Sequence, residues 1–499
     1  MSEDLNFVLK ARRDKLNDLR SRGIAPYAYS FNRTHTAAGA TALLGTAQEG
    51  DRVRVAGRIV ALRAHGKTSF AHLADQSGRI QIYVRRDEIG EDLYTVFEMF
   101  DLGDVVGVGG PLFRTRTGEV TVRAESIELL AKSLRPLPFG KEEVVDGAAV
   151  RHSGFADPEQ RYRQRYADLA VHPEVRGLFV ARSRMIAGIR AFLDERDFLE
   201  VETPILQPLY GGAAARPFTT HHNALDMPLY LRIADELYLK RLVVGGLERV
   251  YEIGHDFRNE GIDRTHNPEF TMLEFYQAYA DYEEMMGVVE ALVERAAMTV
   301  RASSQFADRV PLLTPPFTRL QWVTALDDAL GGGGATSALA LDDGALRNTA
   351  ERVGVQDVAR LSRGKLLDEI FQTLVESKIQ SPTFVMDYPK EISPLAKPKR
   401  GNPALAERFE LFAGGRELAN AFSELNDPIE QRERLEAQAR QKAAGDEEAA
   451  IVDEDYLRAM EYGMPPMGGV GVGIDRLFMH LTGSANIRDV ILFPTMRPE

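Results

Sequence analysis

The first 130 residues change from a helical pattern of apolar positions to a pattern of short strands. Apolar side chains recur among charged ones over residues 3–22 with a roughly helical period, which stops at Gly23 and Pro26. We therefore expect an amphipathic N-terminal helix. From Val53 to about Leu130 the period falls to two, in five short stretches separated by glycine-containing turns. Five such strands predict a small β-barrel.

The rest of the chain begins with a change in composition. Residues 135–157 combine proline, glycine and charge without a sustained period, which is typical of a linker that carries an inserted segment. Residues 161–198 then follow a helical pattern that ends in the strand-like FLEVETPIL. We expect an α+β multidomain protein with a helix and five-stranded barrel over 1–145, a linker over 146–157 and a mixed unit over 158–499.

A hairpin is predicted where polar and apolar positions alternate after residue 250. Arg258 and Glu260 fall on the polar face of the first strand, and a second strand begins near Glu269. On one face the second strand adds a ring, a carboxylate and a phenol: Phe270, Glu274 and Tyr276. This set suits a nucleotide together with an amine, because a guanidinium binds phosphate or carboxylate through two parallel bonds. The alternative for Arg258 is an ordinary ion pair with Glu260 or Glu252.

A second group of acidic residues lies far along the chain. If Gly414 and Gly415 form a two-residue hairpin turn, Glu410 pairs with Ala419 and shares a face with Glu417. Two facing carboxylates repel each other unless a cation lies between them. Mg²⁺ shared with phosphate oxygens is the usual solution in ATP chemistry. We therefore predict Glu410 and Glu417 to be magnesium ligands.

Asn420 and Glu424 follow Glu417 at offsets of 3 and 7. These offsets share one face of a helix but not one face of a strand, so we expect the strand to yield to a helical turn. The turn would bring Glu424 into the same pocket, where it could pair with a substrate ammonium. A salt bridge from Glu424 to Arg416 or Arg408 is the structural alternative.

Near the C-terminus, glycine alternates with Val and Ile directly before Asp475 and Arg476. Such a run is a weak signal of phosphate binding, and tight packing of strands is the alternative. Arg476 at the junction of strand and helix favours a nucleotide. There a guanidinium can cover one face of adenine or contact the outer phosphates.

Composition narrows the chemistry. The 499 residues include no Cys, which excludes disulfides, thiolate metal sites and cysteine nucleophiles and leaves oxygen ligands for any metal. The N-terminus has charges where a secretory signal needs an apolar run, and no later stretch is long and apolar enough to span a bilayer. We therefore expect a cytoplasmic protein with no membrane partner.

The barrel strands are basic although the chain is acidic. The net charge of the chain is -13. The stretch from Arg52 to Arg86 nevertheless contains eight basic residues and a single acidic one, Asp75. A basic barrel with aromatic residues is typical of oligonucleotide binding, in which bases stack on exposed rings. Phe70, His72 and Gln81 are the expected base readers; a solvated strand face is the alternative. Residues 53–130 thus favour a nucleic-acid partner.

Three segments together resemble the signature motifs of class II aminoacyl-tRNA synthetases: FLEVETPIL with Pro204, FRNE with HNPEF, and GVGIDRL. Within that class, the barrel is similar to the subgroup for lysine, aspartate and asparagine. The segments GGAAARPF, RIADELYLKRL, GGRELANAFSELND and RDVILFP look like the lysine enzymes. The similarity covers about residues 5–497.

The resemblance implies an OB-fold barrel and an antiparallel catalytic sheet flanked by helices, in a homodimer formed around the first motif. It implies a ligase that activates L-lysine with ATP to lysyl-adenylate, releases pyrophosphate and transfers lysine to the 3'-terminal adenosine of tRNA(Lys). The adenylate would form by in-line attack on the α-phosphate, without a covalent enzyme intermediate. Mg²⁺ would be the cofactor, with more than one ion per subunit.

The resemblance also implies roles for single residues. The α-amino group of lysine would contact Gly212, Glu236 and Glu274; the carboxylate, Arg258 and Asn420; and the ε-ammonium, Tyr276 and Glu424. ATP would contact Arg258, Glu260, His266, Asn267, Phe270, Glu410, Glu417 and Arg476, of which Glu410 and Glu417 hold Mg²⁺ and Arg258 and Arg476 are catalytic. The middle anticodon uridine would contact Phe70, Gln81 and Glu119. For Glu236, an ordinary acid in the first turn of a helix is the alternative.

In one place the chain departs from the family pattern. Many bacterial relatives have Arg directly before His266, where this chain has Thr265, preceded by Arg264. A contact from a loop arginine at that position to the ATP phosphates is therefore not implied here. Thr-His pairs at this position do occur elsewhere in the family.

Rival functions make different demands on the same residues. An aspartyl or asparaginyl enzyme needs a cationic pocket in place of Glu424 and Tyr276. A ligase that attaches lysine to a protein would lack the barrel. A non-catalytic RNA-binding paralogue predicts losses among Arg258, Glu410, Glu417 and Arg476, and all four are present. The sequence therefore favours the lysine enzyme.

Overall fold

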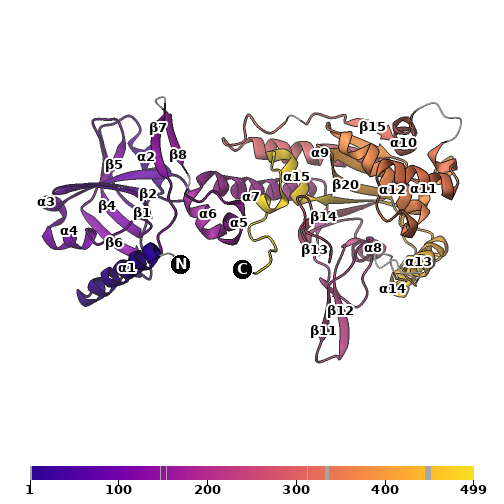
Figure 1. Ribbon diagram of the computed structural model, residues 1–499, viewed down its shortest axis with the longest axis horizontal. Helices are drawn as coiled ribbons and strands as arrows, with labels where there is room; N and C mark the ends of the chain where they lie inside the picture. Colours follow the sequence, from indigo (N-terminus) through magenta and orange to yellow (C-terminus); the bar gives the residue numbers. More distant parts are fainter. Residues whose placement is uncertain are drawn as a thin grey trace. The chain divides into compact units, whose positions relative to one another are not determined.

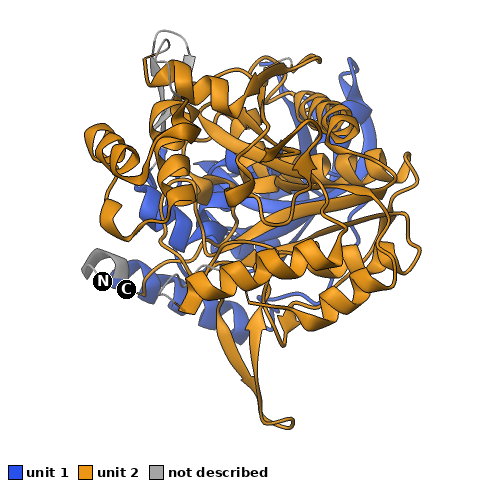
Figure 2. Cartoon of the chain, turned by 90° about the vertical axis from the view of Figure 1, so that its right-hand side faces the viewer, with its two compact units in different colours: residues 1–176 blue, residues 177–499 orange. Residues whose placement is uncertain are grey.

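The computed structural model describes residues 3–145, 148–152, 154–311, 313–331, 337–443 and 451–498. Contacts divide the chain into two compact units, Met1–Arg176 and Gly177–Glu499 (Figure 2). Among the described residues, no helix combines the length and the apolar character that are needed to cross a membrane.

The first unit contains the predicted β-barrel. Its strand order is β1-β2-β3-β5-β4-β6, and a second pairing of β1 with β4 closes the sheet. Alternate side chains such as Val55, Ile82 and Val108 fill the interior. The last predicted strand is two strands, because residues 124 and 125 lie outside both. The bounds are β1 Glu49–His65, β2 Thr68–Ala74, β3 Arg79–Arg85, β4 Val105–Arg114, β5 Val120–Arg123 and β6 Ser126–Ala131.

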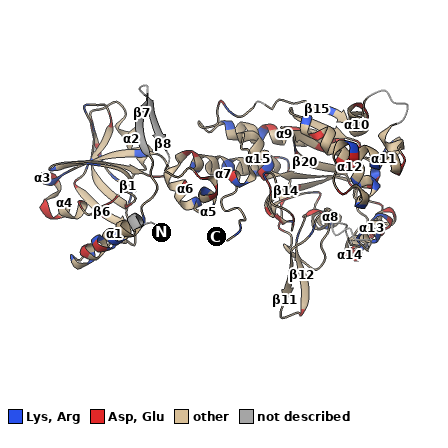
Figure 3. Ribbon diagram, in the orientation of Figure 1, with Lys and Arg blue, Asp and Glu red and all other residues tan. Residues whose placement is uncertain are grey.

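Helices α2 and α3 of this unit pack against the barrel strands, and α1 to α4 lie around the barrel in Figure 1. The predicted N-terminal helix is confirmed as α1 (Glu3–Ser21). It has acidic and basic residues along its length (Figure 3), and Lys15 binds Asp101 of the barrel unit at 2.6 Å. The other helices are α2 Ala37–Leu44, α3 Arg86–Ile89, α4 Glu91–Phe97, α5 Pro158–Arg163 and α6 Arg165–Val171.

The segment inserted in the predicted linker is a β-hairpin. Strands β7 (Lys141–Val145) and β8 (Ala148–His152) pair antiparallel. Residues 146, 147 and 153 lie outside the described part of the chain. The sequence did not predict these strands, because KEEVV and AAVRH show no alternation of apolar and polar positions.

The second unit is built on an eight-stranded sheet in the order β15-β16-β19-β20-β21-β14-β13-β9. Neighbouring strands are antiparallel except the outer pairs β15–β16 and β13–β9. The bounds are β9 Leu199–Glu200, β13 Arg249–Phe257, β14 Glu269–Ala278, β15 Thr318–Gln321, β16 Thr383–Met386, β19 Arg408–Ala413, β20 Arg416–Ser423 and β21 Met467–Gly473. The mostly antiparallel sheet agrees with the expected fold. Within FLEVETPIL only β9 and the first residue of β10 (Leu206–Gln207) are strand, so that predicted strand is much shorter than expected.

Helices cover the sheet and supply most of the core. α7 (Pro173–Asp194), α9 (Tyr282–Arg301) and α15 (Ile474–Thr482) pack on the face that bears Leu273 and Phe275 of β14. The even-numbered side chains of β14 point to the opposite face. A smaller core surrounds Trp322. The remaining helices are α8 Glu236–Val244, α10 Trp322–Ala329, α11 Asp343–Val353, α12 Arg363–Leu374, α13 Pro428–Ala443, α14 Glu454–Glu461 and α16 Ile487–Val490.

Two small sheets complete this unit. β12 (Met227–Leu231) pairs with β10 (Leu206–Gln207) and β11 (Thr219–His222), and the β11–β12 hairpin projects from the unit in Figure 1. β17 (Pro398–Lys399) pairs with β18 (Asn402–Ala406).

The predicted helical turn after Glu417 is wrong, because β20 continues as a strand to Ser423. Gly414 and Gly415 do form the hairpin turn, both with positive φ. A β-bulge then shifts the pairing, so that Glu410 faces Asn420 rather than Ala419. The extra residue reverses the alternation of β20 and places side chains at offsets of 3 and 7 on one strand face.

Candidate active site

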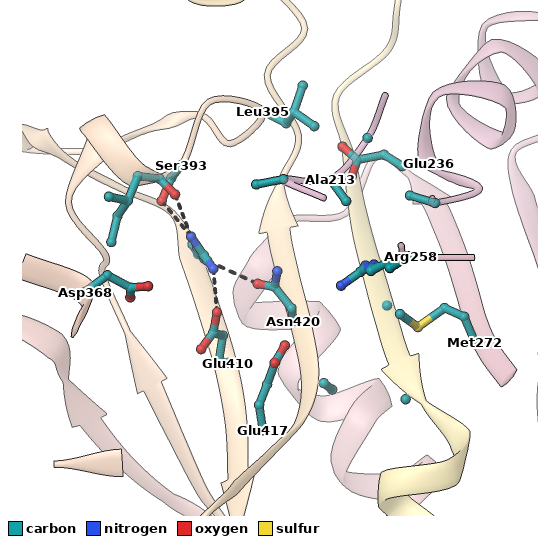
Figure 4. A pocket seen from close by; sticks show the side chains of 18 of the residues that line it. Ala213, Glu236, Arg258, Met272, Asp368, Ser393, Leu395, Glu410, Glu417 and Asn420 are labelled. Carbon is teal, nitrogen blue, oxygen red and sulfur yellow. Dashed lines mark hydrogen bonds and ion pairs between the residues drawn. The ribbon is translucent and has the colours of Figure 1, made fainter. Parts of the chain in front are cut away.

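A cavity of about 770 Å³ lies on the face of the sheet opposite α9. Strands β14, β19, β20 and β21 form its floor, and residues from α8, α12 and the loop after β13 line its sides (Figure 4). This volume can hold a nucleotide or a comparable ligand. The cavity brings together all the predicted lysine and ATP residues from Gly212 to Arg476.

The carboxylates of Glu410 and Glu417 lie side by side in Figure 4, because the bulge puts them on one face. Each also has a cationic neighbour: Glu410 pairs with Arg408, and Glu417 accepts from Arg476 at 3.1 Å. The Tyr388 hydroxyl donates to Glu410 at 2.8 Å. Two oxygen ligands are therefore available for a cation at the edge of the cavity.

Electrostatic repulsion is strong around these carboxylates. Burial raises the pKa of Glu410 to about 7, and the charges of Glu417 and Asp368 add to this rise although Arg408 opposes it. Burial and the same acidic group raise the pKa of Glu376 to about 7. Within the described residues, no three acidic or His side chains form a ready metal cluster. A divalent cation bound here would therefore need further ligands, such as phosphate oxygens.

Arg408 is a site residue that the sequence suggested only as an alternative partner for Glu424. It does not pair with Glu424; its guanidinium binds Glu410, Ser393 and the Asn420 side chain (Figure 4). The Arg408 Nε donates to Asn420 Oδ1 at 3.1 Å. Because the amide oxygen is thus engaged, the amide nitrogen of Asn420 is left to donate into the cavity.

Arg258 lies directly after β13 and does not form the ion pair that was the alternative for it. Glu252 pairs with Arg232, and no ion pair joins Arg258 to Glu260 among the described residues. The Arg258 guanidinium lies 5.1 Å from the centre of the Phe270 ring, and its Nε donates weakly to the Ile233 carbonyl. Most of its donors are therefore available to a ligand in the cavity.

The loop between β13 and β14 is braced by Asp263. Its carboxylate accepts from the backbone N–H and hydroxyl of Thr265, at 2.6 and 3.0 Å, and bonds to His266 Nδ1 at 2.8 Å. The hydrogen bonds from Thr265 and His266 lower the pKa of Asp263 to about 2. Thr265, the departure from the family pattern, therefore stabilises this loop.

His266 connects the loop to the start of α15. Its Nε2 lies 2.8 Å from Arg476 Nη2, and since a guanidinium can only donate, Nε2 is the acceptor. The proton of the ring is therefore on Nδ1, facing Asp263. Nearby, Asn267 donates to the Glu269 carbonyl at 2.6 Å, while its buried Oδ1 has no partner. The loop thus contributes two polar side chains, His266 and Asn267, to the cavity that Arg476 also lines.

At the α8 end of the cavity, Glu236 and Glu424 both pair with Lys240. Gly212 lies against Glu236 with a φ of 89°, where a Cβ would come within 3.2 Å of the Glu236 Cβ. Glu236 is the first residue of α8, as its alternative role of a first-turn helix acid requires, but its side chain is buried and paired with Lys240. Lys240 is a second site residue that the sequence did not predict.

Glu274 and Tyr276 project from β14 towards the same end of the cavity. The Tyr276 hydroxyl donates to Glu274 at 2.9 Å, and the backbone N–H of Asp235 donates to the other Glu274 oxygen at 3.2 Å. Burial raises the pKa of Glu274 above its usual range. At Gly469 of β21, a Cβ would lie 2.1 Å from Glu424 and 2.3 Å from the Tyr276 ring. The glycine run therefore allows these two side chains to lie on the strand.

A network of buried ionisable side chains lies next to this end of the site, and it includes Asp235, whose backbone N–H binds Glu274. The guanidinium of Arg232 faces Asp235, Glu252 and Asp256, with nitrogen to oxygen distances of 2.8, 2.6 and 3.4 Å. Burial raises the pKa of Asp235 to about 10 and that of Asp256 to about 6. Gly254 leaves room for the network, since a Cβ there would meet Arg232 at 1.9 Å.

The predicted base readers of the barrel lie on one face of β2 and β3. Phe70 pairs with Tyr83, and His72 pairs with Gln81. Glu119 joins them by accepting from Gln81 Nε2 at 2.7 Å and lying 2.7 Å from His72 Nε2. The Phe70 ring is 4.9 Å from that of Tyr83. A ring, an amide, an imidazole and a carboxylate thus lie together on this face of the barrel, with Gln81 also accepting from the Thr121 hydroxyl.

Comparison with known proteins agrees with this arrangement. Residues 157–497 match the model of the family "tRNA synthetases class II (D, K and N)", and residues 53–130 match that of the "OB-fold nucleic acid binding domain". Similar proteins include lysine–tRNA ligases of Carboxydothermus hydrogenoformans (53% identity, 99% of both chains covered) and Moorella thermoacetica (52%, 99% of this chain and 98% of the relative). That of Oceanobacillus iheyensis is 49% identical over the whole of both chains. The chain therefore belongs to the class II tRNA synthetases of the D, K and N group, among relatives that are lysine–tRNA ligases.

Proposed function

We propose that this protein is a lysine–tRNA ligase, which uses ATP to form lysyl-adenylate and transfers lysine to tRNA(Lys). The observation that carries the choice of amino acid is the buried anionic end of the cavity, where Glu236, Glu274 and Glu424 lie together and Lys240 pairs with two of them. An aspartyl or asparaginyl enzyme needs to bind an acidic or amide side chain, for which this end has the wrong charge. A lysine ε-ammonium is attracted to it.

We assign the lysine contacts by the groups that each side chain has left to offer. Glu236, Glu274 and the backbone at Gly212 are placed for the α-amino group, and Glu424 with the Tyr276 oxygen for the ε-ammonium. Arg258 and the amide nitrogen of Asn420 would bind the carboxylate. Selectivity follows because an uncharged analogue leaves buried polar groups without partners, an effect that can reach about 10⁴ in discrimination.

ATP would occupy the part of the cavity between Arg258 and Arg476. We assign adenine to the Phe270 ring, and the phosphates to Arg258, His266 and Arg476, with Glu260 and Asn267 at the edge of the nucleotide. When lysine attacks, Arg258 stabilises the charge that develops on the α-phosphate, and Arg476 stabilises the departing pyrophosphate. Holding the two substrates in line supplies much of the rate enhancement, without a general base from the chain.

We assign Mg²⁺ to Glu410 and Glu417, and infer more than one ion per subunit. Support comes from the donor set: two adjacent carboxylates in a group whose mutual repulsion is relieved by a cation. When bound, Mg²⁺ would neutralise charge on the ATP phosphates. Before ATP binds, Arg408 and Arg476 balance the two carboxylates.

The barrel would bind the anticodon of tRNA(Lys). We assign the middle uridine to Phe70, Gln81 and Glu119, since a base can stack on the ring while its polar edge meets the amide and the carboxylate. The division into an anticodon domain over 1–145, a linker over 146–157 and a catalytic domain over 158–499 fits these roles.

A homodimer and a cytoplasmic location complete the proposal. Four apolar side chains in the first motif and the segment after it are exposed in the single chain: Leu199, Ile205, Leu206 and Leu209. Burying them against a second copy would remove apolar area from water. Sedimentation analysis should show a dimer at micromolar concentration.

The decisive experiment is amino-acid-dependent exchange of pyrophosphate into ATP by the purified protein. We expect exchange with L-lysine and none above background with aspartate or asparagine. Charging of tRNA(Lys) with lysine then tests the second step. Exchange with aspartate alone, or no exchange with any amino acid, would refute the proposal.

A further inference from the structure

The side chain of Lys240 lies behind the anionic end of the cavity, completely shielded from solvent. Its ammonium contacts Glu236 one helical turn earlier on α8 and Glu424 just after β20. Both carboxylates line the cavity, whereas Lys240 is not among the described residues that do. The ammonium is also 5.9 Å from the centre of the Tyr276 ring, which itself lines the cavity. Lys240 therefore reaches the cavity only through its partners.

The charges around Lys240 do not balance. Two carboxylates face one ammonium, so the three groups carry one net negative charge when all are ionised. A buried ion pair with a surplus charge is unfavourable unless a further cation arrives. The cavity side of Glu236 and Glu424 is where such a cation can bind.

We propose that Lys240 is a positioning residue for amino-acid recognition: its ammonium holds Glu236 and Glu424 together from behind, so that Glu236 faces the α-amino group and Glu424 the ε-ammonium of the substrate with one uncompensated negative charge between them. This inference rests on the proposed lysine site. Lys240 itself does not touch the substrate. It acts by fixing where the two carboxylates lie and how readily they lose their protons.

Charged and titratable side chains from several elements influence the pKa values of Glu236 and Glu424. They are Glu274 and Tyr276 of β14, Arg408 of β19 and Tyr456 of α14, and Arg241 of α8 in turn acts on Tyr456. Burial raises the pKa of Glu424 to about 8, and the charge of Glu236 adds to this rise. The ammonium of Lys240 is the largest opposing influence on that pKa. Without Lys240, the two carboxylates would retain a proton to higher pH.

The test replaces Lys240 with Met, which keeps the length and apolar stem but removes the charge. The matched control is Lys10→Met on the exposed face of α1. Pyrophosphate exchange is measured from pH 6.5 to 8.5 with lysine and ATP varied separately. We expect Lys240→Met to raise the KM for lysine about tenfold at pH 7, the effect of displacing one pKa by about one unit. The KM for ATP should stay within about twofold, since the ion-pair partners of Lys240 are Glu236 and Glu424, which are assigned to lysine.

The pH profile separates charge from shape. With the ammonium gone, the acidic limb of kcat/KM for lysine should move to higher pH by about one unit. Lys240→Arg, which keeps a cation, should leave the limb near its wild-type position. Lys240→Gln is a second neutral variant, to be used if Met impairs folding, and its amide can donate a hydrogen bond to one carboxylate. Circular dichroism and thermal melting identify the variants that fold.

Outcomes distinguish this inference from the proposed function. If the wild-type chain shows no lysine-dependent exchange, the proposed function itself fails. If the wild type is active but a folded neutral variant keeps both the lysine KM and the acidic limb, Lys240 has no positioning role. An equal rise in the lysine KM at every pH, in Arg and neutral variants alike, would show that only the shape of Lys240 matters and would overturn the inference.

Discussion

Replacing Glu424 with Gln tests the proposed lysine site most directly. Glu424 is 1% exposed, and its carboxylate lies against Lys240, Tyr276 and the backbone of Gly469. Glutamine has nearly the same shape, so the substitution removes charge without opening a cavity. Lys240 keeps Glu236 as a partner, and no buried ammonium is left alone. We therefore expect the variant to fold with little loss of stability.

The effect on lysine binding should be large. Truncating one partner of a buried, hydrogen-bonded charge pair costs about 2 to 5 kcal/mol. Glutamine keeps an acceptor oxygen, so the lower part of this range, about 2 to 3 kcal/mol, applies. At about 1.4 kcal/mol per factor of ten, the KM for lysine should rise about 30-fold to 150-fold.

Steady-state pyrophosphate exchange gives both constants in one assay. The KM for ATP should change less than about twofold, because among the described residues Glu424 forms its ion pair with Lys240 and not with a residue assigned to the nucleotide. Glu433→Gln on the exposed face of α13 is the matched control and should change neither constant. If the KM values for lysine and ATP rise together, or if the lysine KM is unchanged, the assignment of Glu424 to the ε-ammonium is wrong.

Three further predictions concern other parts of the chain. Phe70→Ala should weaken charging of tRNA about tenfold or more and spare pyrophosphate exchange, since base stacking is worth about 1 to 3 kcal/mol; loss of exchange would indicate a folding role. Glu417→Gln should raise the Mg²⁺ concentration that gives half-maximal pyrophosphate exchange, whereas the control Glu433→Gln should not. If the Mg²⁺ dependence of Glu417→Gln equals that of the wild type, the metal assignment is wrong. Burial raises the pKa of Asp256 to about 6, above its value of about 4 in the unfolded chain, so the wild type should lose about 2.7 kcal/mol of stability as the pH rises from below 4 to above 6. Asp256→Asn should not show that loss, and parallel melting temperatures of the two proteins at pH 4 and 7.5 would count against it.

Much of the fold and the site follows from local patterns. The alternation that placed Arg258, Phe270, Glu274 and Tyr276 on one surface is a property of the strand backbone, so it is visible in the sequence. The hairpin turn at 414–415 was predictable for the same reason, because two consecutive glycines readily adopt positive φ. These features depend on residues that are near each other in the chain.

The bulge in β20 was not predictable by the same reasoning. Offsets of 3 and 7 from Glu417 indicated that the side chains must share a face, and this inference was right. A helical turn and a strand with one inserted residue both satisfy it. The choice depends on pairing with β19 and β21, which continues across residues 419–423 and keeps the backbone hydrogen-bonded as a strand. The spacing of the residues therefore predicted which side chains share a face, but not whether a helical turn or a bulged strand brings them together.

The buried cations show a further limit of sequence reasoning. Arg232, Lys240 and Arg408 stand among many charged residues, and only their partners distinguish them from solvent-exposed ones. The spacing of four between Glu236 and Lys240 was visible, but it equally describes an exposed helical ion pair of little energy. What gives Lys240 its importance is the third group, Glu424, nearly two hundred residues later in the chain. The carboxylates that would bind lysine thus depend on Lys240, which is buried behind them and does not line the cavity. Such a cation can be identified only once the fold shows that the three groups lie together.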